Sequence, residues 1–391
     1  MDWLRRADWL TRERVRGYAL LLAVASLALL ANSYIKAMGP DGSDFLAFWG
    51  AGKATAAGNP AAAYDLAVQQ HIQTATGSEG WFAFVNPPPF LFVVAPLGLL
   101  PFALAWIVWV AGTWGFWAWA GIRAFPRLWP LVIAYPGALI AAGHGQTGLL
   151  TGALLIVAAD RLEKQPGLAG AAIGALVIKP HLAVLAPVWF AAGSRWRAFL
   201  VAAGMAVGLL ALSWLIFGSA TLAAYTSSWQ ASGMLMEGSN PDFLLRMTTF
   251  FAQARLLGGE GAGLVAGLLS ALVALAAVAL AHRRFAGDPR GVGAAVLAAS
   301  ALASPYLFNY DLPFLLFPTL WLVEQGLARG FRDFEKLVLV VLWFAPYATR
   351  ALAFSLGINP MPLAALVLLA MVWTRAESHR ARNRTGTGSG P

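Results

Sequence analysis

Long apolar segments with almost no charge dominate this chain and most restrict the folds open to it. The first apolar run extends from Tyr18 to Ile35, and similar runs recur almost to the end of the chain. A helix needs roughly 20 mostly apolar residues to cross a bilayer. We therefore predict an all-α, polytopic membrane protein with about 12 transmembrane helices. The expected spans are 17–37, 86–122, 128–143, 146–160, 167–179, 181–193, 198–217, 261–282, 291–304, 311–328, 337–355 and 358–374.

The composition supports this class and excludes others. Charged residues make up 12% of the 391 residues, while 59% are hydrophobic. A soluble protein would carry about 25% charged residues. The chain has no cysteine, which excludes disulfides, thiol catalysis and cysteine metal sites. No HExxH or DxD motif is present, so we predict no metal site and no cofactor.

The net charge of +9 comes from short basic clusters between apolar runs, which is typical of topology signals. A nucleic-acid partner is not expected, because these residues do not form a patch on a soluble domain. The clusters predict cytoplasmic segments, including the N-terminus 1–16 and a disordered tail 375–391, around a membrane domain 17–374. They are the N-terminal arginines, Arg123/Arg127, Arg161/Lys164, Arg195/Arg197, Arg283/Arg284/Arg290, Arg329/Arg332/Lys336 and the tail from Arg375 to Arg384.

The opposite connections then lie on the extracytoplasmic face, and they hold most of the polar residues with chemical potential. Two of these connections, 38–85 and 218–260, are long loops, and the second carries Arg246. Long loops are usually functional or disordered, and these are too aromatic for disorder. Short spans that end in such residues predict a funnel cut into the membrane from one side.

The segment 86–122 allows two topologies. It must cross an odd number of times, but prolines divide it into a short and a long piece. Either Pro87–Leu100 is re-entrant, or two helices meet at Leu100–Pro101 and Arg123 and Arg127 lie outside.

Asp44 is the leading candidate for catalysis, because an ionisable group close to the bilayer is costly and is a functional hypothesis by default. It follows the first span directly. Asp44 is a helix-end carboxylate accepting backbone hydrogen bonds, a loop residue in water, or a general base at the water-facing mouth of the funnel. Phe45, Phe48 and Trp49 would place it beside an apolar, lipid-like wall.

Three further connections carry candidate binding residues, each with a structural alternative. Lys179, between two short spans, either snorkels to the surface or contacts a phosphate together with His181. His144 and Gln146 flank a glycine that allows close backbone approach, and the structural alternative is a histidine that serves only the fold. In the third connection, Asp311 either caps the following helix or joins sugar-binding groups. The sugar-binding candidates there include Tyr306, Asn309 and Tyr310.

The motifs in their order along the chain resemble glycosyltransferase family 87, the DUF2029 group. The resemblance covers roughly residues 40–325 and rests on short motifs that are more specific as an ordered set than alone. They are Asp44-Phe45, Ala51-Gly52-Lys53-Ala54, Tyr64-Asp65, Asn86-Pro87-Pro88-Pro89-Phe90, Gly145-Gln146, Ile178-Lys179-Pro180 and Ser304-Pro305-Tyr306 through Tyr310-Asp311.

The resemblance implies a GT-C fold in a bacterial inner membrane and an active site on the extracytoplasmic side. Family members move a sugar, typically mannose, from a polyprenyl-phosphate donor to a lipid or glycan acceptor with inversion. The family's catalytic aspartate corresponds to Asp44, and Lys179 would hold the carrier phosphate. Mycobacterial members have a histidine near the late Ser-Pro motif, where this chain reads Phe308-Asn309-Tyr310-Asp311. The remaining expected substrate contacts are Asn86, His144, Gln146, His181, Arg246, Asn309, Tyr310 and Asp311.

The residues fit this chemistry independently. A phosphate-linked sugar already has a good leaving group, so one base and one positive charge suffice. A glycosidase would need two carboxylates flanking the bond. A transporter or lipid flippase would explain broken helices, but it predicts two similar halves, and the sequence shows no convincing internal repeat. A non-enzymatic scaffold would not need polar residues gathered on one face.

Overall fold

The chain folds into helices and connections, as seen in a computed structural model that describes residues 2–237 and 241–385, with side chains for 2–229 and 241–376. Helices account for 81% of the chain, and the described residues contain no strand. The α-helices are α1 (Asp2–Arg6), α2 (Arg12–Ala37), α3 (Phe45–Ala56), α4 (Leu66–Thr74), α5 (Leu91–Gly98), α6 (Phe102–Ala124), α7 (Trp129–Ile133), α8 (Pro136–Gly143), α9 (Gly148–Arg161), α10 (Pro166–Ala175), α11 (Ala186–Ala192), α12 (Trp196–Glu237), α13 (Pro241–Arg246), α14 (Phe250–Arg284), α15 (Pro289–Ala303), α16 (Leu316–Arg329), α17 (Glu335–Leu356) and α18 (Met361–Thr385).

The connections add six 3₁₀ helices within the described residues. They are η1 (Pro60–Tyr64), η2 (Pro88–Phe90), η3 (Pro126–Leu128), η4 (Leu176–Ile178), η5 (Pro180–Ala183) and η6 (Asn309–Leu315). Most of them begin at a proline, whose fixed φ and missing N–H suit the first turn of a helix.

Five helices among the described residues are long and apolar enough to cross a membrane, and they lie in α2, α6, α12, α14 and α17. Five shorter apolar segments add to them, namely Pro88–Gly98, Pro166–Ile178, Pro180–Ala192, Pro289–Ala303 and Met361–Ala376. The chain is thus an all-helical polytopic membrane protein. The count of about 12 spans stays a prediction.

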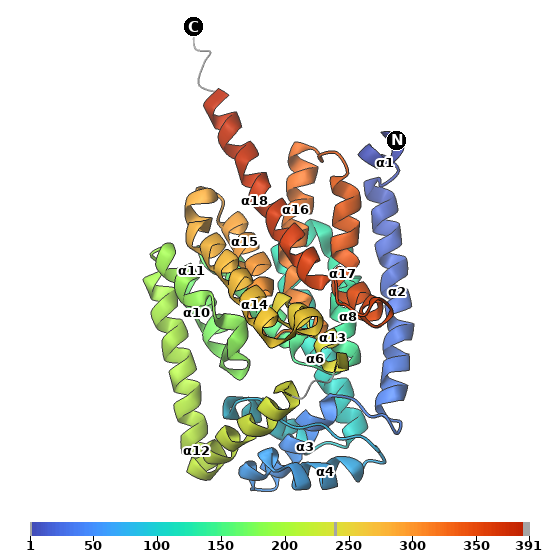
Figure 1. Cartoon of the computed structure of the whole chain (residues 1–391), viewed down its shortest axis with the longest axis vertical. Helices are drawn as coiled ribbons and strands as arrows, with labels where there is room; N and C mark the ends of the chain where they lie inside the picture. Colours follow the sequence, from blue (N-terminus) through green and yellow to red (C-terminus); the bar gives the residue numbers. More distant parts are fainter. Residues whose placement is uncertain (1, 238–240, 386–391) are drawn as a thin grey trace.

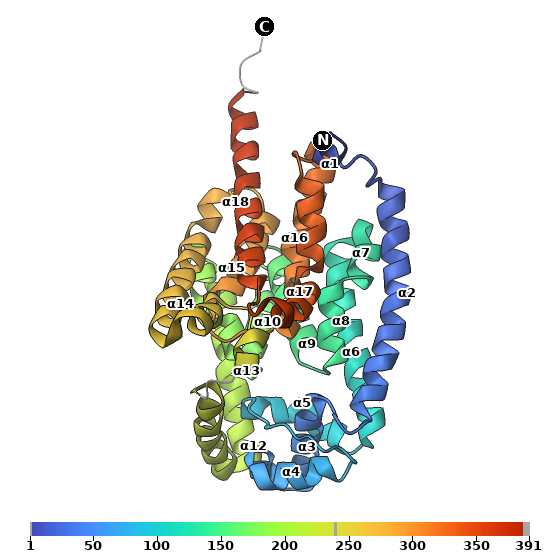
Figure 2. The same cartoon turned by 45° about the vertical axis from the view of Figure 1, so that its right-hand side comes forward.

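The helices form an upper bundle and a lower layer. Helices α3, α4 and α5 lie together at the lower end, away from both termini (Figures 1 and 2). Helices α2, α6 and α12 extend from the bundle down to this layer, whereas α8, α9, α10, α15, α16 and α17 stay above it. The short helices therefore end at mid-height. Such an arrangement places polar helix ends inside the bundle rather than at its outer surfaces.

The structure favours the re-entrant arrangement for 86–122. Helix α5 is short and packs on α3 in the lower layer, while α6 alone crosses to the other end. The residues just after α6 lie beside the start of α2, because the Arg16 guanidinium is 5.9 Å from the centre of the Trp129 ring. Leu100 is fixed at the turn between α5 and α6 by the Trp49 indole, whose N–H donates to its carbonyl over 2.9 Å.

Two predicted features differ in detail from the structure. The connections 38–85 and 218–260, predicted as long loops, are largely helical within the described residues, since they contain α3, α4, α13 and the ends of α12 and α14. The tail predicted to be disordered from residue 375 instead continues as α18 to Thr385, and residues 386–391 lie outside the described part.

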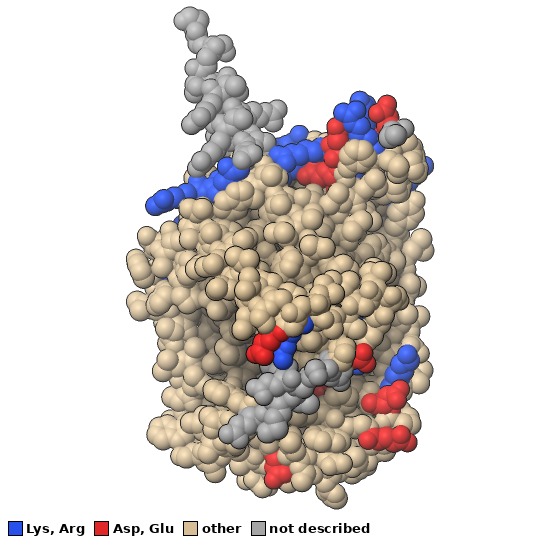
Figure 3. Space-filling model, viewed as in Figure 1, with Lys and Arg blue, Asp and Glu red and all other residues tan. Residues whose placement is uncertain are grey.

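The basic clusters gather at the upper end (Figure 3). Arg5 pairs with Asp333 at 2.8 Å, and Arg290 pairs with Glu324 at 2.8 Å. Arg375 and Glu335 form a buried pair there, with side chains 3% and 4% exposed. A broad uncharged zone separates this rim from the scattered charges lower down (Figure 3), which suits a surface that faces lipid tails.

Two glycines set the distance between α3 and α5. A Cβ on Gly52 would lie 2.1 Å from the carbonyl oxygen of Val94, and a Cβ on Gly98 would lie 2.1 Å from the carbonyl carbon of Gly52. Small residues let helix backbones approach closely where lipid provides no hydrophobic drive for association. This contact fixes α3, and with it Asp44 at its first turn.

Replacing Gly52 with alanine should destabilise the chain by about 1–3 kcal/mol, because the added methyl group meets backbone that cannot move aside. Thermal unfolding of the purified protein in detergent, followed by tryptophan fluorescence, measures this loss. The matched control is Gly112→Ala in α6, where an added Cβ meets nothing within 4 Å. An unfolding midpoint of Gly52→Ala equal to that of the control would contradict the close approach.

Candidate functional site

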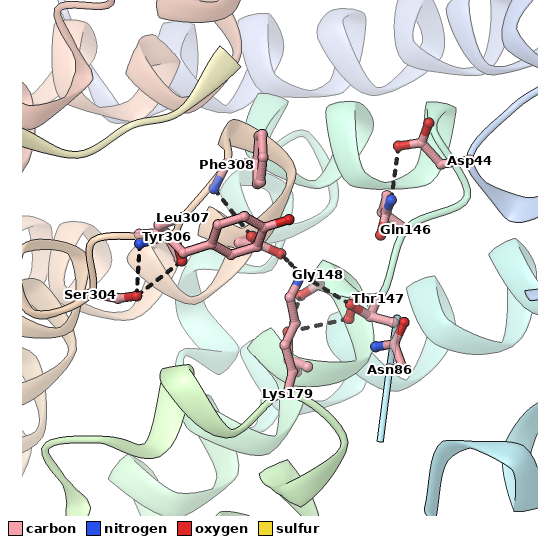
Figure 4. Close-up of polar contacts among 12 residues, drawn as sticks. Asp44, Asn86, Gln146, Thr147, Gly148, Lys179, Ser304, Tyr306, Leu307 and Phe308 are labelled. Carbon is pink, nitrogen blue, oxygen red and sulfur yellow. Dashed lines mark hydrogen bonds and ion pairs between the residues drawn. The ribbon is translucent and has the colours of Figure 1, made fainter. Parts of the chain in front are cut away.

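Asp44 and Gln146 face each other across the boundary between the lower layer and the bundle. The side-chain N–H of Gln146 donates to Asp44 Oδ2 over 2.8 Å, and both residues are half-buried (Figure 4). Asp44 stands at the N-terminus of α3, yet its side chain makes no capping hydrogen bond to that helix. The structural alternative, a carboxylate occupied by backbone amides, therefore does not describe Asp44 in this structure.

The turn that carries Gln146 packs closely against α3. Gly145 adopts a positive φ of 62°, and a Cβ there would lie 2.7 Å from that of Phe45. The Trp109 indole N–H donates to the Gly145 carbonyl over 2.8 Å. The glycine thus permits the close approach that brings Gln146 to Asp44. His144 Nδ1 lies 2.9 Å from its own helix at Ile140 O.

A buried ion pair joins two connections of the bundle. Lys179 Nζ donates to Asp311 Oδ1, with side chains 11% and 0% exposed. Lys179 also lies 3.4 Å from Thr147 Oγ1 (Figure 4) and 5.3 Å from the centre of the Tyr310 ring. Asp311 Oδ2 accepts the backbone N–H of Phe308 over 3.1 Å, which satisfies its second oxygen.

Asn309 serves the scaffold rather than an open surface. It is 1% exposed, and its amide donates to Pro346 O and to Thr349 Oγ1, both over 2.8 Å. Its oxygen accepts from Asn359 Nδ2 over 3.1 Å. Because every polar atom of this amide has a partner inside the protein, we infer that Asn309 positions its neighbours and does not contact substrate.

His181 and Asn86 are neighbours of the turn that carries Lys179. The His181 ring meets Tyr306 edge-on at 5.7 Å, and its Nε2 is buried without a hydrogen-bond partner among the described residues. Asn86 donates to the carbonyl of Ile178 over 3.2 Å, directly before Lys179. The Tyr64 hydroxyl donates to the Asn86 carbonyl over 2.9 Å, so this asparagine ties the lower layer to the lysine turn.

Tyr306 and Tyr310 lie within electrostatic range of both Asp44 and Asp311. Burial raises the pKa of Tyr306 to about 12, and the negative charges of Asp311 and Asp44 act in the same direction. Its phenol is therefore protonated and can donate a hydrogen bond. The Tyr310 ring lies 6.0 Å from that of His144 and 5.3 Å from Lys179 Nζ, so three predicted connections come together around this ring.

Two residues of this region, Thr147 and Arg350, were not predicted from the sequence. Thr147 follows Gln146 and contacts Lys179, but a threonine at a helix start carries no distinctive signal. Arg350 lies inside the predicted span 337–355 and interacts electrostatically with Asp44, Tyr310 and Arg246. An arginine within an apolar span was the available signal. Arg246 itself is exposed at the end of α13.

The arrangement combines one accessible carboxylate, one compensated lysine and several neutral donors. The described residues contain no group of three or more His, Asp or Glu side chains that could hold a metal ion. Asp311 is fully buried and already paired, so it is not placed to act as a second reacting carboxylate beside Asp44. Chemistry that needs one base fits this geometry better than chemistry that needs two carboxylates.

Comparison with known proteins gives one match. A family model described as glycosyltransferase family 87 matches residues 84–305, more than half of the chain. The match includes His144, Gln146 and Lys179, whereas Asp44 and Asp311 lie outside it. No curated protein and no solved structure matches the chain.

The ion pair between Lys179 and Asp311 predicts a strong asymmetry between single and double substitutions. Asp311→Ala leaves a buried lysine without its carboxylate and should cost about 3–5 kcal/mol of stability. Replacing both partners, as Lys179→Met with Asp311→Leu, should recover most of that loss, because apolar side chains need no compensation. Thermal unfolding in detergent compares the variants.

The control for this comparison is Asp333→Ala, which breaks the exposed pair with Arg5. That change should leave the unfolding midpoint nearly unchanged, since exposed pairs contribute little. If Asp311→Ala were as stable as this control, the pair would not hold the two connections together.

Proposed function

We propose a specific reaction for this chain, which belongs to glycosyltransferase family 87. In this reaction a sugar, expected to be mannose, passes from a polyprenyl-phosphate donor to a lipid or glycan acceptor with inversion. Membership in the family supports glycosyl transfer at a membrane in general. The donor class, the sugar and the stereochemistry rest on the motifs and on the chemistry of the site.

The observation that carries the proposal is the half-buried Asp44 carboxylate held by Gln146. As general base, Asp44 takes the proton from an acceptor hydroxyl while that oxygen bonds to the anomeric carbon. The bond from this carbon to the phosphate oxygen breaks, and the polyprenyl phosphate leaves with the electron pair. Phosphate is a good leaving group, so no general acid is required.

The donor phosphate lies, in this proposal, beside Lys179 and His181. Lys179 supplies a compact ammonium group, and Asp311 fixes its position rather than competing for the substrate, because Asp311 is fully buried. His181 contributes a ring nitrogen that has no partner among the described residues. Tyr310, His144, Gln146 and Asn86 contact the sugar in this proposal, and Asn309 and Asp311 hold Tyr310 in place.

The proposed topology follows the basic rim. The upper end with both termini faces the cytoplasm, including residues 1–16 and 375–391, because basic residues favour that side. The lower layer and the site then face the extracytoplasmic side of a bacterial inner membrane. Within the membrane domain 17–374 we propose a GT-C fold, for which the long lower segments 38–85 and 218–260 supply the outer part.

A transporter or lipid flippase remains the alternative function, since broken helices and charges at membrane depth also serve transport. The family match favours transfer, and the hydrogen bond from Gln146 to Asp44 gives that carboxylate a fixed orientation. Asp44 Oδ1 has no hydrogen-bond partner among the described residues, and a carboxylate held through its other oxygen suits proton abstraction better than the passage of a lipid.

Asp44→Asn should lower the transfer rate by about 10²–10⁴-fold, because the amide cannot accept the acceptor proton. The assay gives the purified protein a panel of radiolabelled polyprenyl-phosphate sugars and total membrane lipid, and it measures label in the acceptor fraction. Asp41→Asn is the matched control, since Asp41 is exposed three residues earlier and should keep wild-type activity. Wild-type activity in Asp44→Asn would remove the proposed base.

The same preparations, reconstituted in vesicles, separate the two functions. If the wild-type protein moved labelled lipid between leaflets but produced no glycosylated product with any sugar of the panel, the transport alternative would replace the proposed reaction.

A further inference from the structure

The N-terminal segment, residues 2–16, is a folded part of the upper rim. The Arg5 carbonyl accepts the backbone N–H of Phe334 over 2.7 Å. The Lys336 ammonium group donates to the Ala7 carbonyl over 3.1 Å. These contacts hold the segment against the turn between α16 and α17 (Figure 2). Its surface is therefore ordered before a partner binds, which lowers the entropic cost of binding.

Four arginines of the N-terminal segment are exposed and form no ion pair within 4.0 Å among the described residues. They are Arg6, Arg12, Arg14 and Arg16. Two of the three acidic residues of the segment, Asp2 and Asp8, instead lie 3.9 Å from Arg5 and from Lys336. The four exposed guanidinium groups are thus available to an anion from outside the protein.

The arginines at the start of α2 lie at the level of lipid headgroups. Helix α2 is long and apolar enough to cross a membrane, and only 6% of the residues in its apolar part are buried inside the protein. Most of its side chains therefore face lipid rather than other helices. Arg12, Arg14 and Arg16 stand in its first five residues, directly before the apolar run from Tyr18. Their guanidinium groups lie where acyl chains give way to charged headgroups.

Tryptophan rings accompany these arginines. Trp3 is 66% exposed, and its ring stacks on that of Trp9 with the ring centres 5.5 Å apart. The Arg14 guanidinium donates to the Trp9 carbonyl over 3.3 Å, which joins this stack to α2. The Arg16 guanidinium lies 5.9 Å from the centre of the exposed Trp129 ring. Tryptophan is enriched at the membrane–water interface, because its ring is apolar and its N–H is polar.

An anionic phospholipid fits this combination of charge and position. Its phosphate oxygens match the planar fork of a guanidinium group, and its acyl chains can lie along the apolar part of α2. Clusters of roughly four to eight basic residues immediately beside a span attract anionic lipids in this way. A zwitterionic lipid gains less, because its own positive charge compensates its phosphate. Arginines that served only the direction of insertion would show no preference between the two lipids.

We propose that the N-terminal segment and the first turns of α2 form a binding surface for anionic phospholipids of the leaflet that surrounds the upper rim. The arginines bind the headgroup phosphate, and Trp3 and Trp9 lie beside it in the interface. This inference rests on the membrane-spanning character of α2 and does not depend on the proposed reaction.

The test measures which lipid lies beside α2. The chain has no cysteine, so Gly17→Cys provides a single site for a bimane fluorophore, and an added Cβ there meets nothing within 4 Å. The labelled full-length protein is reconstituted in phosphatidylcholine vesicles that contain increasing fractions of brominated phosphatidylglycerol or brominated phosphatidylcholine. Quenching by bromine gives the relative association of the two lipids at this site. Phosphatidylglycerol should be favoured about fivefold, the effect of one arginine near its headgroup.

A second label tests whether the preference is local. Gly208→Cys lies on the exposed surface of α12, also without a neighbour within 4 Å of an added Cβ, and it should show no preference between the lipids. Both sites compare two lipids at one depth, so the depth of the label does not affect the comparison. High salt should remove the preference at residue 17, because it screens exposed charges, and this measurement needs no further substitution.

Arginine variants identify the groups responsible. Arg12→Gln with Arg16→Gln, one turn apart on α2, should bring the preference at residue 17 close to equality, whereas the corresponding lysine pair should keep most of it. The matched control is Lys164→Gln with Arg197→Gln, which removes two exposed charges from other basic clusters and should change nothing at residue 17. If the glutamine pair failed to fold, the salt dependence of the labelled protein would still decide.

Three outcomes would overturn the proposal. Equal association of the two lipids at residue 17 would leave the arginines with a role in insertion alone. An equal preference at residues 17 and 208 would show that the whole protein surface, and not this segment, selects anionic lipid. A preference that persists in high salt would exclude attraction between the arginines and the headgroup as its cause.

Discussion

The cost of burying a charge in an apolar bundle governs the arrangement of this site. Lys179 and Asp311 come from connections that are far apart in sequence, and each would be strongly destabilising alone. Their pairing holds the turn after α10 against the segment that begins η6. Tyr310 and Thr147 lie next to the lysine. The polar interior of the bundle is therefore organised around one ion pair, whose two charges cancel.

Neutral amides and close backbone contacts complete what the ion pair begins. Asn309, Asn359 and Gln253 connect α13, α14, α17 and the start of α18 through buried hydrogen bonds. At the lower layer, Gly52 and Gly98 let α3 and α5 touch at backbone distance. Each device suits a membrane interior, where helix association depends on packing and on satisfied polar groups rather than on the exclusion of water.

Local patterns made much of the fold predictable. The length of the apolar runs predicted the helical segments, and the basic clusters predicted which connections lie at the same end of the molecule. Both signals are contained in short stretches of sequence. The polar residues that meet in the structure, among them Asp44, Gln146 and Lys179, were also recognisable as breaks in apolar runs. The division of 86–122 into a short α5 and a crossing α6 depends on contacts with α3, and the sequence left it open.

The partners of each polar side chain could not be predicted in the same way. Asn309 looked like a sugar contact until its amide was found fully engaged with Thr349 and Asn359. Arg350 stands out within an apolar span, but its neighbour Arg246 lies on a helix that is distant in sequence. Pairing of this kind depends on three-dimensional proximity, and a single sequence carries no direct record of it.

The position of the chain ends has a practical consequence. Asp2 and the upper end of α18 lie at the same end of the molecule, away from the α3–α5 layer (Figure 1). A fusion partner, an affinity tag or an antibody epitope attached at either end would stand clear of Asp44 and of any lipid that approaches it. Protein engineered for purification or imaging can thus be assayed without removing its attachment.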